Sequence, residues 1–350
     1  MLLIKTSSLG DVIHTLPAIT DAAKTIAGIK FDWVVEENFA EIPSWHPVVD
    51  KVIPVALRRW RKHLWQTWRS GEWRAFKNLL AADSYDLVID AQGLLKSAWL
   101  THYAKGFRVG LNKHSAREPL ASLFYQHSYA VAWGQHAVER IRQLFAQALG
   151  YPLPASMGDY GLAKDILLES NNSLDKYLVF LHGTTWQTKH WPEYYWRQLA
   201  EQLNRLQVKV KLPWGNAEEK ARAQRIAENL PFIELLPQLN LTGIASVLAG
   251  ASGCIAVDTG LGHLAAALAV PTISLFGATD PQLTGAYGKQ QIHLLGHFPA
   301  CVPCLKKYCN YQATEQDKAS FDLAREWPLC FSQINPTVVL EIINSKFKLK

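Results

Sequence analysis

The stretch that decides the fold is LLIKTSSLGDVIHTLPAI, residues 2–19, at the start of the chain. An apolar, strand-like run ends in a short Ser/Gly loop, and a segment with helical character follows it. This order is typical of nucleotide-binding α/β proteins, in which glycines let a phosphate approach the backbone. Here the loop holds only Gly10, and Asp11 follows at once. Because a carboxylate repels a phosphate, this loop needs another role than phosphate binding.

The strand–helix pattern continues along the whole chain. Apolar strand-like runs alternate with longer segments of helical spacing up to residue 150, and residues 151–165 then lose this periodicity and gather Pro and Gly. A second series of the same kind follows the predicted linker. The pattern predicts two Rossmann-like α/β domains that face each other across a central cleft, at 1–160 and 161–335, with a closing helix at 336–350.

Composition narrows the class of protein. The 350 residues are 49% hydrophobic and 19% charged, and no apolar run reaches the ~18 residues that a membrane-spanning helix needs. The N-terminus enters a strand directly and lacks the anatomy of a signal peptide. Five cysteines, an odd number, do not suggest a disulfide scaffold. The sequence therefore predicts a cytoplasmic globular protein.

Positive charge is concentrated in residues 58–77, RRWRKHLWQTWRSGEWRAFK. This segment holds seven Lys or Arg, one Glu and four of the thirteen tryptophans, so it alone accounts for the net charge of +6. Arginines interleaved with aromatic residues fit single-stranded nucleic acid and equally an interfacial amphipathic element. A solvated face is the third interpretation, and composition does not decide among them.

Ligands of open α/β sheets bind at the carboxyl ends of the strands, so the strand–helix loops are the informative places. In HGTTWQTKHWP (182–192), Thr184, Thr185 and Lys189 lie near a helix N-terminus, where they are suited to hold a diphosphate. The alternative is a solvated lysine. In LPWGNAEEKARA (212–223), two first-turn carboxylates either complement the helix dipole or bind the hydroxyl groups of a ribose.

Two further patterns remain ambiguous on spacing alone. AVDTGLGHLAAAL (256–268) contains a permissive dinucleotide pattern, with Asp280 about twenty residues on, yet Asp258 or Thr259 has an equally simple role as a helix cap. Cys301, Cys304 and Cys309, with Cys330 farther on, are candidate ligands of a structural zinc ion, although their spacing is not that of a standard zinc finger. Free or redox-active thiols are the alternative.

Asp11 has two interpretations as well. It is suited to cap the helix that follows it. Its position at a strand tip also suits a general base that takes a proton from an acceptor hydroxyl group.

Several long stretches, in order along the chain, match one known family: KTSSLGDVIHTLPAITDA (5–22), VIDAQGLLKSA (88–98), KHWPE (189–193), KLPWG (211–215) and VDTGLGHLAAAL (257–268). They resemble the lipopolysaccharide heptosyltransferases of glycosyltransferase family 9, and within that family the heptosyltransferase I branch. The likeness runs from residue 2 to about residue 292. It implies the GT-B fold, with the acceptor mainly on the first Rossmann-like domain and the sugar nucleotide mainly on the second.

The resemblance also implies roles for the matching residues. Asp11 matches the catalytic base, which deprotonates a Kdo hydroxyl group for attack on the heptose anomeric carbon with inversion. Lys189, Thr184 and Thr185 match positions that hold the ADP phosphates, and Glu219 matches the ribose-binding carboxylate. The residues that match the family's donor-contacting turn are Asp258, Thr259, Gly260 and His263. The residues that match positions facing the anionic acceptor are Ser8, Gly10, Arg58, Arg59, Arg61, Lys62 and Arg117.

The partners implied by the resemblance are ADP-heptose and Kdo-lipid A, at the cytoplasmic face of the inner membrane. No cofactor is required for catalysis in such an enzyme, since lysine, hydroxyl groups and helix N-termini stabilise the leaving diphosphate. Transfer to another core position, such as the second heptose, is the main alternative, followed by a GT-B nucleotide-sugar 2-epimerase. Nucleic acid is not expected as a partner, because the charge outside residues 58–77 sums to zero.

Overall fold

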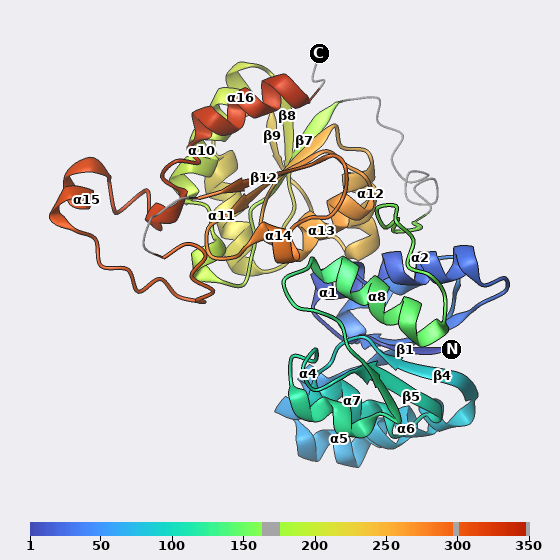
Figure 1. Ribbon diagram of the computed structural model, residues 1–350. Coiled ribbons are helices and arrows are strands. Elements are labelled where there is room, and N and C mark those ends of the chain that lie inside the picture. The colour runs from blue at the N-terminus through green and yellow to red at the C-terminus, as the bar shows by residue number, and fades with distance from the viewer. Residues whose placement is uncertain (163–175, 297–300, 348–350) are drawn as a thin grey trace. The chain divides into compact units, whose positions relative to one another are not determined.

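The chain forms two units, Met1–Ala163 and Lys164–Lys350, each built around a six-stranded sheet (Figure 1). The structure is a computed structural model, and it describes residues 1–162, 176–296 and 301–347. The predicted linker 151–165 therefore lies partly outside the described residues.

The first sheet is entirely parallel, with the strand order β3-β2-β1-β4-β5-β6. This is the strand order of a Rossmann fold. Its central strands are near-continuous apolar runs because helices cover both faces of the sheet. The strands are β1 (Leu2–Ile4), β2 (Phe31–Glu36), β3 (Val49–Val55), β4 (Ser84–Asp90), β5 (Lys105–Leu111) and β6 (His127–Tyr129).

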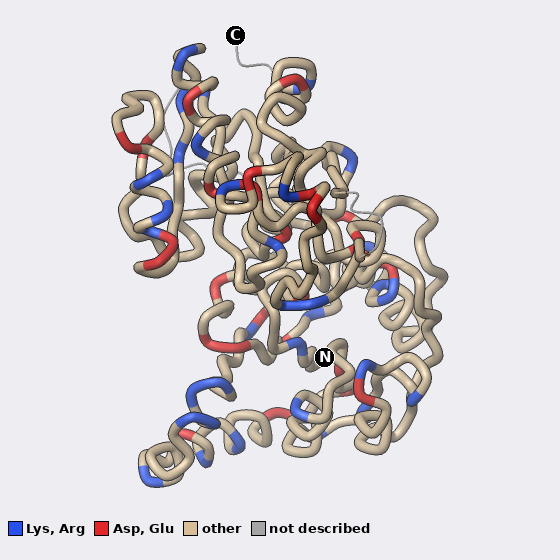
Figure 2. The backbone as a smooth tube through the Cα atoms, turned by 90° about the vertical axis from the view of Figure 1, so that its left-hand side faces the viewer, with Lys and Arg blue, Asp and Glu red and all other residues tan. Residues whose placement is uncertain are grey.

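Helices pack on the first sheet according to the alternation of its side chains. Ile4, Val34 and Val88 form one core with Trp60 and Phe76. Figure 2 marks the Lys and Arg positions along the backbone in blue. The helices of the unit are α1 (Leu9–Ile13), α2 (Leu16–Thr25), α3 (Glu41–Ser44), α4 (Leu57–Lys62), α5 (Leu64–Ser70), α6 (Glu72–Ala82), α7 (Leu95–Thr101) and α8 (Ala137–Leu149), with 3-10 turns η1 (Glu37–Phe39) and η2 (Pro119–Phe124).

The opposite face of the first sheet is covered by α2 and α8. The ring of Phe31 lies 6.0 Å from that of Phe145 on α8, and Asp21 on α2 forms a buried ion pair with Arg142 on α8, Oδ2 to Nε 2.6 Å. Arg142 also donates to the backbone oxygens of Pro154 and Ser156. This buried arginine therefore fixes the end of the first unit against its own helices.

The second sheet repeats the design of the first. Its order is β12-β11-β10-β7-β8-β9, which is the Rossmann order again when the strands are numbered from β7. All its strand pairs are parallel. The strands are β7 (Tyr177–Leu181), β8 (Lys209–Leu212), β9 (Ile233–Leu235), β10 (Gly253–Val257), β11 (Thr272–Phe276) and β12 (Gln291–Leu295). The predicted fold class, two Rossmann-like α/β domains, is confirmed.

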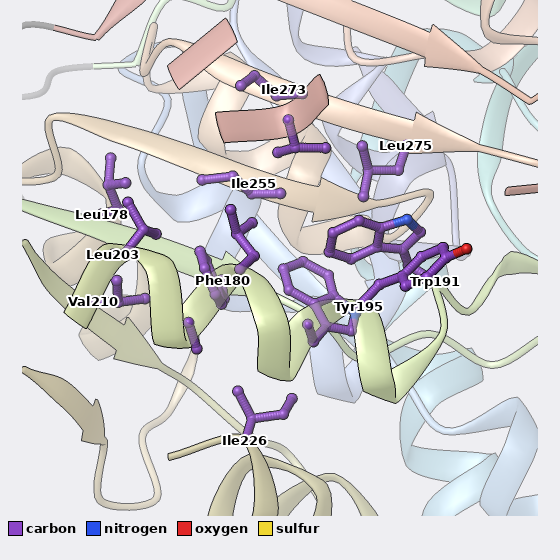
Figure 3. Close-up of a cluster of buried hydrophobic side chains, with 14 of the residues drawn as sticks. Leu178, Phe180, Trp191, Tyr195, Leu203, Val210, Ile226, Ile255, Ile273 and Leu275 are labelled. Atoms are coloured by element: carbon purple, nitrogen blue, oxygen red, sulfur yellow. The ribbon is translucent and has the colours of Figure 1, made fainter. Parts of the chain in front are cut away.

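Figure 3 shows a hydrophobic core of this unit, in which Phe180, Val210 and Ile255 of the sheet cluster with Tyr195 and Leu203 of α10. The closing helix α16 adds Val339 and Ile343 to the same core. The helices of the unit are α10 (Glu193–Arg205), α11 (Ala217–Ala227), α12 (Leu241–Ala249), α13 (Gly260–Ala267), α14 (Pro281–Thr284), α15 (Glu315–Ser320) and α16 (Pro336–Lys346), with 3-10 turns η3 (Gln187–Lys189) and η4 (Leu329–Phe331).

Each sheet has one point where the strand order reverses. It lies between β1 and β4 in the first unit and between β7 and β10 in the second. Loops that leave these neighbouring strands diverge to opposite faces, and the crevice between them is where ligands bind in open α/β sheets. The loops after β1, β4, β7 and β10 are therefore the places where the fold favours a site.

One buried histidine makes the stability of the first unit depend on pH. His46 Nδ1 accepts from Val48 N at 3.3 Å, and His46 Nε2 lies 2.8 Å from Thr20 Oγ1. Thr20 Oγ1 itself donates to Leu16 O, so it accepts from the imidazole N–H. Burial lowers the pKa of His46 to about 4, from an ordinary value of 6.5.

Between pH 6.5 and 4, the unfolded chain binds a proton at His46 before the folded chain does, so acidification destabilises the fold. We expect this group to lower the free energy of unfolding by up to about 3 kcal/mol across that window. Urea titrations at a series of pH values measure the loss. The His46→Gln variant should lose less stability on acidification than wild type, whereas the exposed His63→Gln variant should follow wild type. An equal loss in all three would contradict the assignment.

Candidate active site

The loop after β1 holds the carboxylate of Asp11. Both Ser8 N and Ser8 Oγ donate to Asp11 Oδ2, each at 2.7 Å, and Lys5 Nζ lies 3.9 Å from Asp11 Oδ1. The Asp11 side chain keeps 43% of its surface exposed. One carboxylate oxygen is thus fixed by the loop while the group remains accessible to a ligand.

The capping interpretation of Asp11 is wrong in detail. Ser8 is the N-cap of α1, with extended backbone, and Asp11 stands three positions later and accepts from the Ser8 amide. Gly10 is buried inside α1. A capping contact uses Asp11 Oδ2 alone, so it is compatible with a second role for the carboxylate.

Three side chains that spacing did not single out hold this loop in place. Lys5 is buried and donates to Ala91 O at 3.0 Å, and burial lowers its pKa. Gln92 Oε1 accepts from Thr6 N at 2.7 Å, and Lys96 Nζ donates to Ser7 Oγ at 3.0 Å. The available signal was a lysine inside an otherwise apolar strand, since a buried cation needs a partner.

Three of the predicted acceptor-binding arginines lie near enough to this loop to lower the pKa values of its lysines. Burial lowers the pKa of Lys96, Arg58 and Arg61 lower it further, and Asp11 opposes the shift. Arg117 likewise lowers the pKa of Lys5, the lysine that lies 3.9 Å from Asp11. Ser8, Arg58, Arg61, Lys62 and Arg117 are all exposed. The loop after β1 therefore lies among exposed cations, although the carboxylates of Asp90 and Glu36 act more strongly on Lys5 and Lys96 than these arginines do.

Arg59 differs from its neighbours. Its guanidinium is held by Glu37, Nη2 to Oε2 3.1 Å, and by Glu72, Nη1 to Oε2 2.8 Å. The backbone N–H of Arg58 donates to Glu36 Oε1 at 2.8 Å. The guanidinium of Arg58 lies over the ring of Phe39. The carboxylates around Arg59 compensate its charge, so it contributes less positive charge than sequence alone indicated.

In the second unit, predicted donor-binding residues converge on the buried carboxylate of Asp258. Lys189 Nζ lies 2.6 Å from Asp258 Oδ2, and Thr279 Oγ1 donates to the same oxygen at 2.5 Å. His263 Nε2 lies 3.9 Å from Asp258 Oδ1, and Thr184 Oγ1 donates to Asp258 O at 3.0 Å. We call these five residues the Asp258 cluster. It gathers the carboxyl ends of β7, β10 and β11, beside the reversal point.

The helix-cap alternative for this turn holds for the position of Thr259 but not for a side-chain contact. Thr259 is the N-cap of α13, which begins at Gly260, but its side chain makes no capping hydrogen bond. Asp280, which stands about twenty residues after the dinucleotide pattern, caps α14 by accepting from Gln282 N at 2.8 Å. Thr185 is exposed next to the cluster. The Asp258 carboxylate orients a lysine ammonium, and an ammonium at a strand–helix loop suits a phosphate.

Glu219 and Glu218 point in different directions from the first turn of α11. Glu219 Oε2 accepts from Gly215 N at 2.7 Å, and its carboxylate lies against Gly183, where a Cβ would come within 2.7 Å of Glu219 Oε1. Glu218 is 86% exposed and reaches Arg222 at 3.7 Å. Only Glu219 therefore adjoins the loop that carries Thr184.

This difference gives a matched pair of variants. Glu219→Gln should raise the KM for a nucleotide donor about tenfold with little change in kcat, because a carboxylate that binds ribose hydroxyl groups contributes to binding rather than to the chemical step. Glu218→Gln should behave as wild type. Steady-state kinetics with the donor varied provides the measurement, and equal KM values in the two variants would contradict the assignment of Glu219.

The described residues do not show the zinc site predicted from the cysteines near the end of the chain. Cys301, Cys304, Cys309 and Cys330 are all free thiols, and within the described residues no group of three or more His, Cys, Asp or Glu side chains is arranged to hold a metal ion. Cys330 packs against the core beside Gly277, and burial, aided by the other three thiols, raises its pKa to about 12. The four thiols nevertheless lie near enough to one another for the other three to raise the pKa of Cys330.

The segment that carries these cysteines nevertheless supports the Lys189 loop. Thr188 Oγ1 donates to Lys306 O, and Leu305 N donates to Ala278 O at 2.9 Å, next to Thr279. The segment thus ties η3 to the end of β11.

In the part of the chain that the structure describes, no helix is both long and apolar enough to cross a bilayer.

Comparison with known proteins agrees with this geometry. Residues 73–314 match the family model described as glycosyltransferase family 9 (heptosyltransferase). The chain is 66% identical over 337 residues to lipopolysaccharide heptosyltransferase 1 of Pseudomonas aeruginosa, covering 96% of this chain and 94% of the relative. It is 54% identical over 293 residues to the Escherichia coli K12 protein of that name, covering 83% and 92%.

Solved structures agree as well. The E. coli heptosyltransferase WaaC with ADP superposes with a TM-score of 0.84 at 46% identity and covers 99% of both chains. The same protein with ADP-2-deoxy-2-fluoro heptose gives a TM-score of 0.83. The two Rossmann-like domains are thus of the GT-B type, as predicted. The chain belongs to glycosyltransferase family 9, the heptosyltransferases.

Proposed function

We propose that the protein transfers L-glycero-D-manno-heptose from ADP-heptose to a Kdo residue of Kdo-lipid A, in the synthesis of the lipopolysaccharide inner core. The relatives named lipopolysaccharide heptosyltransferase 1 support the reaction, and the E. coli structures with ADP and a fluorinated ADP-heptose support the donor. The observation that carries the mechanism is the Asp11 carboxylate, held by Ser8 through one oxygen and still accessible.

In the proposed reaction, Asp11 accepts the proton of the Kdo hydroxyl group as its oxygen attacks the anomeric carbon of heptose. The bond between that carbon and the phosphate oxygen breaks, and its electron pair leaves with ADP, so the configuration inverts. Arg58, Arg61 and Arg117 bind the anionic acceptor. Lys5 stabilises the negative charge of Asp11 from a distance of 3.9 Å and positions its carboxylate.

On the donor side, Lys189 compensates the charge that develops on the leaving diphosphate, and Thr184 and Thr185 donate hydroxyl hydrogen bonds to it. Asp258 keeps the lysine ammonium at 2.6 Å and so fixes its direction. Thr259, Gly260 and His263 form the turn that contacts the donor, and Glu219 binds the ribose. Preorganised donors of this kind lower the barrier because they need no reorientation during the reaction.

The proposal also assigns a location. An acceptor that carries lipid A acyl chains resides in a bilayer, so the protein works as a peripheral protein on the cytoplasmic face of the inner membrane. The exposed basic residues of the first unit support this assignment, because anionic lipid attracts them.

The decisive experiment mixes the purified protein with ADP-heptose and Kdo-lipid A and measures ADP release. The proposal expects release that requires both substrates and that persists in EDTA. Release without an acceptor indicates an epimerase or a hydrolase, and turnover only with an acceptor that already carries one heptose indicates transfer to another core position. Either result overturns the proposed acceptor.

A further inference from the structure

The four tryptophans of residues 58–77 divide into two pairs. Trp60 is buried and contacts the ring of Trp73 at 5.7 Å, and Trp60 Nε1 donates to Glu72 Oε2 at 2.7 Å. Trp65 and Trp68, on α5, are 71% and 72% exposed and stack on each other, with ring centroids 5.5 Å apart and planes 22° apart. One pair therefore builds the core, whereas the other pair faces solvent.

The exposed pair is part of a small apolar surface. Leu64 precedes it on α5 and is 71% exposed, while Thr67, on the same helix, is buried. We define Leu64, Trp65 and Trp68 as the α5 apolar tip. Three large side chains exposed together on one short helix cost free energy in water, so such a surface marks an interaction site.

Basic residues surround this tip. Lys62 and Arg69 line the same shallow hollow as Leu64 and Trp65, and Arg61 and Arg74 are exposed nearby in the sequence. An apolar face of Trp and Leu rimmed by Lys and Arg is the composition of an interfacial membrane element, in which indole rings enter the headgroup region and cations bind anionic headgroups. Leu64 favours a lipid surface over single-stranded nucleic acid as the partner, because an aliphatic side chain has no aromatic ring on which a base can stack.

We propose that the α5 apolar tip inserts into the interface of an anionic phospholipid bilayer and holds the first unit at the membrane. The inference deepens the proposed function, on which it rests for the bilayer-bound acceptor. The lipid surface, rather than the acceptor sugar, is the partner of Trp65 and Trp68. The arginines near Asp11 remain available for the acceptor.

Vesicle flotation with the full-length protein tests this proposal. Wild type should bind vesicles that contain phosphatidylcholine and phosphatidylglycerol, and bind phosphatidylcholine alone far less, since charge and apolar insertion act together. The Trp65→Ala/Trp68→Ala variant should bind the anionic vesicles about tenfold more weakly. Trp133→Ala is the matched control: this tryptophan is also exposed, at 55%, and its removal should leave binding unchanged.

Activity measurements separate this inference from the proposed function. With a deacylated, water-soluble Kdo acceptor, the double variant should retain wild-type kcat and KM, and with acceptor embedded in anionic vesicles its turnover should fall about tenfold. Equal vesicle binding by wild type and the double variant overturns the membrane tip, whatever the activity. Binding of wild type to a single-stranded oligonucleotide instead of vesicles also overturns it. Absent turnover of the soluble acceptor by wild type overturns the proposed function alone.

Discussion

Asp11→Asn is expected to lower kcat by roughly 10²–10⁴-fold, because an amide cannot take the proton of the attacking hydroxyl group. The substitution preserves size, and the amide oxygen can still accept from Ser8 N and Ser8 Oγ, which now donate to Asp11 Oδ2 at 2.7 Å. The loop after β1 therefore keeps its shape. The measurement is the initial rate of ADP release at saturating donor and acceptor.

The chain supplies a matched control for this prediction. Asp317 on α15 accepts from Thr314 N at 2.7 Å and from Thr314 Oγ1 at 2.8 Å, which is the same capping geometry as that of Asp11. Asp317→Asn should therefore change helix capping to a similar extent and leave the rate unchanged. If both variants lose activity equally, or if Asp11→Asn keeps it, Asp11 is a structural cap and not the base.

Lys189→Met is expected to lower kcat/KM for ADP-heptose by roughly 10²–10³-fold, the usual effect of removing one group that stabilises developing charge. Methionine fills a similar volume but carries no charge. The variant also leaves Asp258 buried with its strongest partner gone, and breaking a buried ion pair costs about 3–5 kcal/mol of stability. A stability measurement must accompany the kinetics for this reason.

A double variant separates the two effects. Lys189→Met/Asp258→Asn removes both charges, so its free energy of unfolding should recover most of the loss while its activity should not recover. Lys318→Met is the control for loss of a paired lysine, since Lys318 also lies 2.6 Å from a carboxylate, that of Glu315, but on exposed α15. Its kinetics should match wild type. Activity that returns together with stability in the double variant would mean that Lys189 only holds the fold.

Much of the fold is predictable from sequence because parallel strands covered on both faces must be apolar throughout. Runs such as those of β7 and β10 are fully buried, and the sequence pattern predicts them correctly. The apolar pattern does not predict strand β6, since its three residues, His127–Tyr129, are polar and only partly buried at the sheet edge. A short edge strand depends on backbone pairing with β5, which hydrophobic periodicity does not report.

The candidate site was predictable only as a set of loops. Spacing placed Lys189 and Asp258 on separate strand–helix loops, but their contact at 2.6 Å follows from the adjacency of β7 and β10 in the sheet. The same holds for Lys96, which reaches Ser7 from the first turn of α7 because β4, the strand before α7, lies beside β1. Spacing likewise does not report that Cys330 packs against the core.

The repeated strand order has a consequence for how such a protein diversifies. Each reversal point is built from loops of one unit, with its own sheet and its own core. Mutations that retune the arginines near Asp11 therefore leave the Asp258 cluster intact. If the first unit binds the acceptor and the second the nucleotide, as proposed, a lineage that meets a new acceptor can accumulate changes in the first half of the gene while purifying selection preserves nucleotide recognition in the second. Duplicated architecture thus lets the two specificities evolve at different rates.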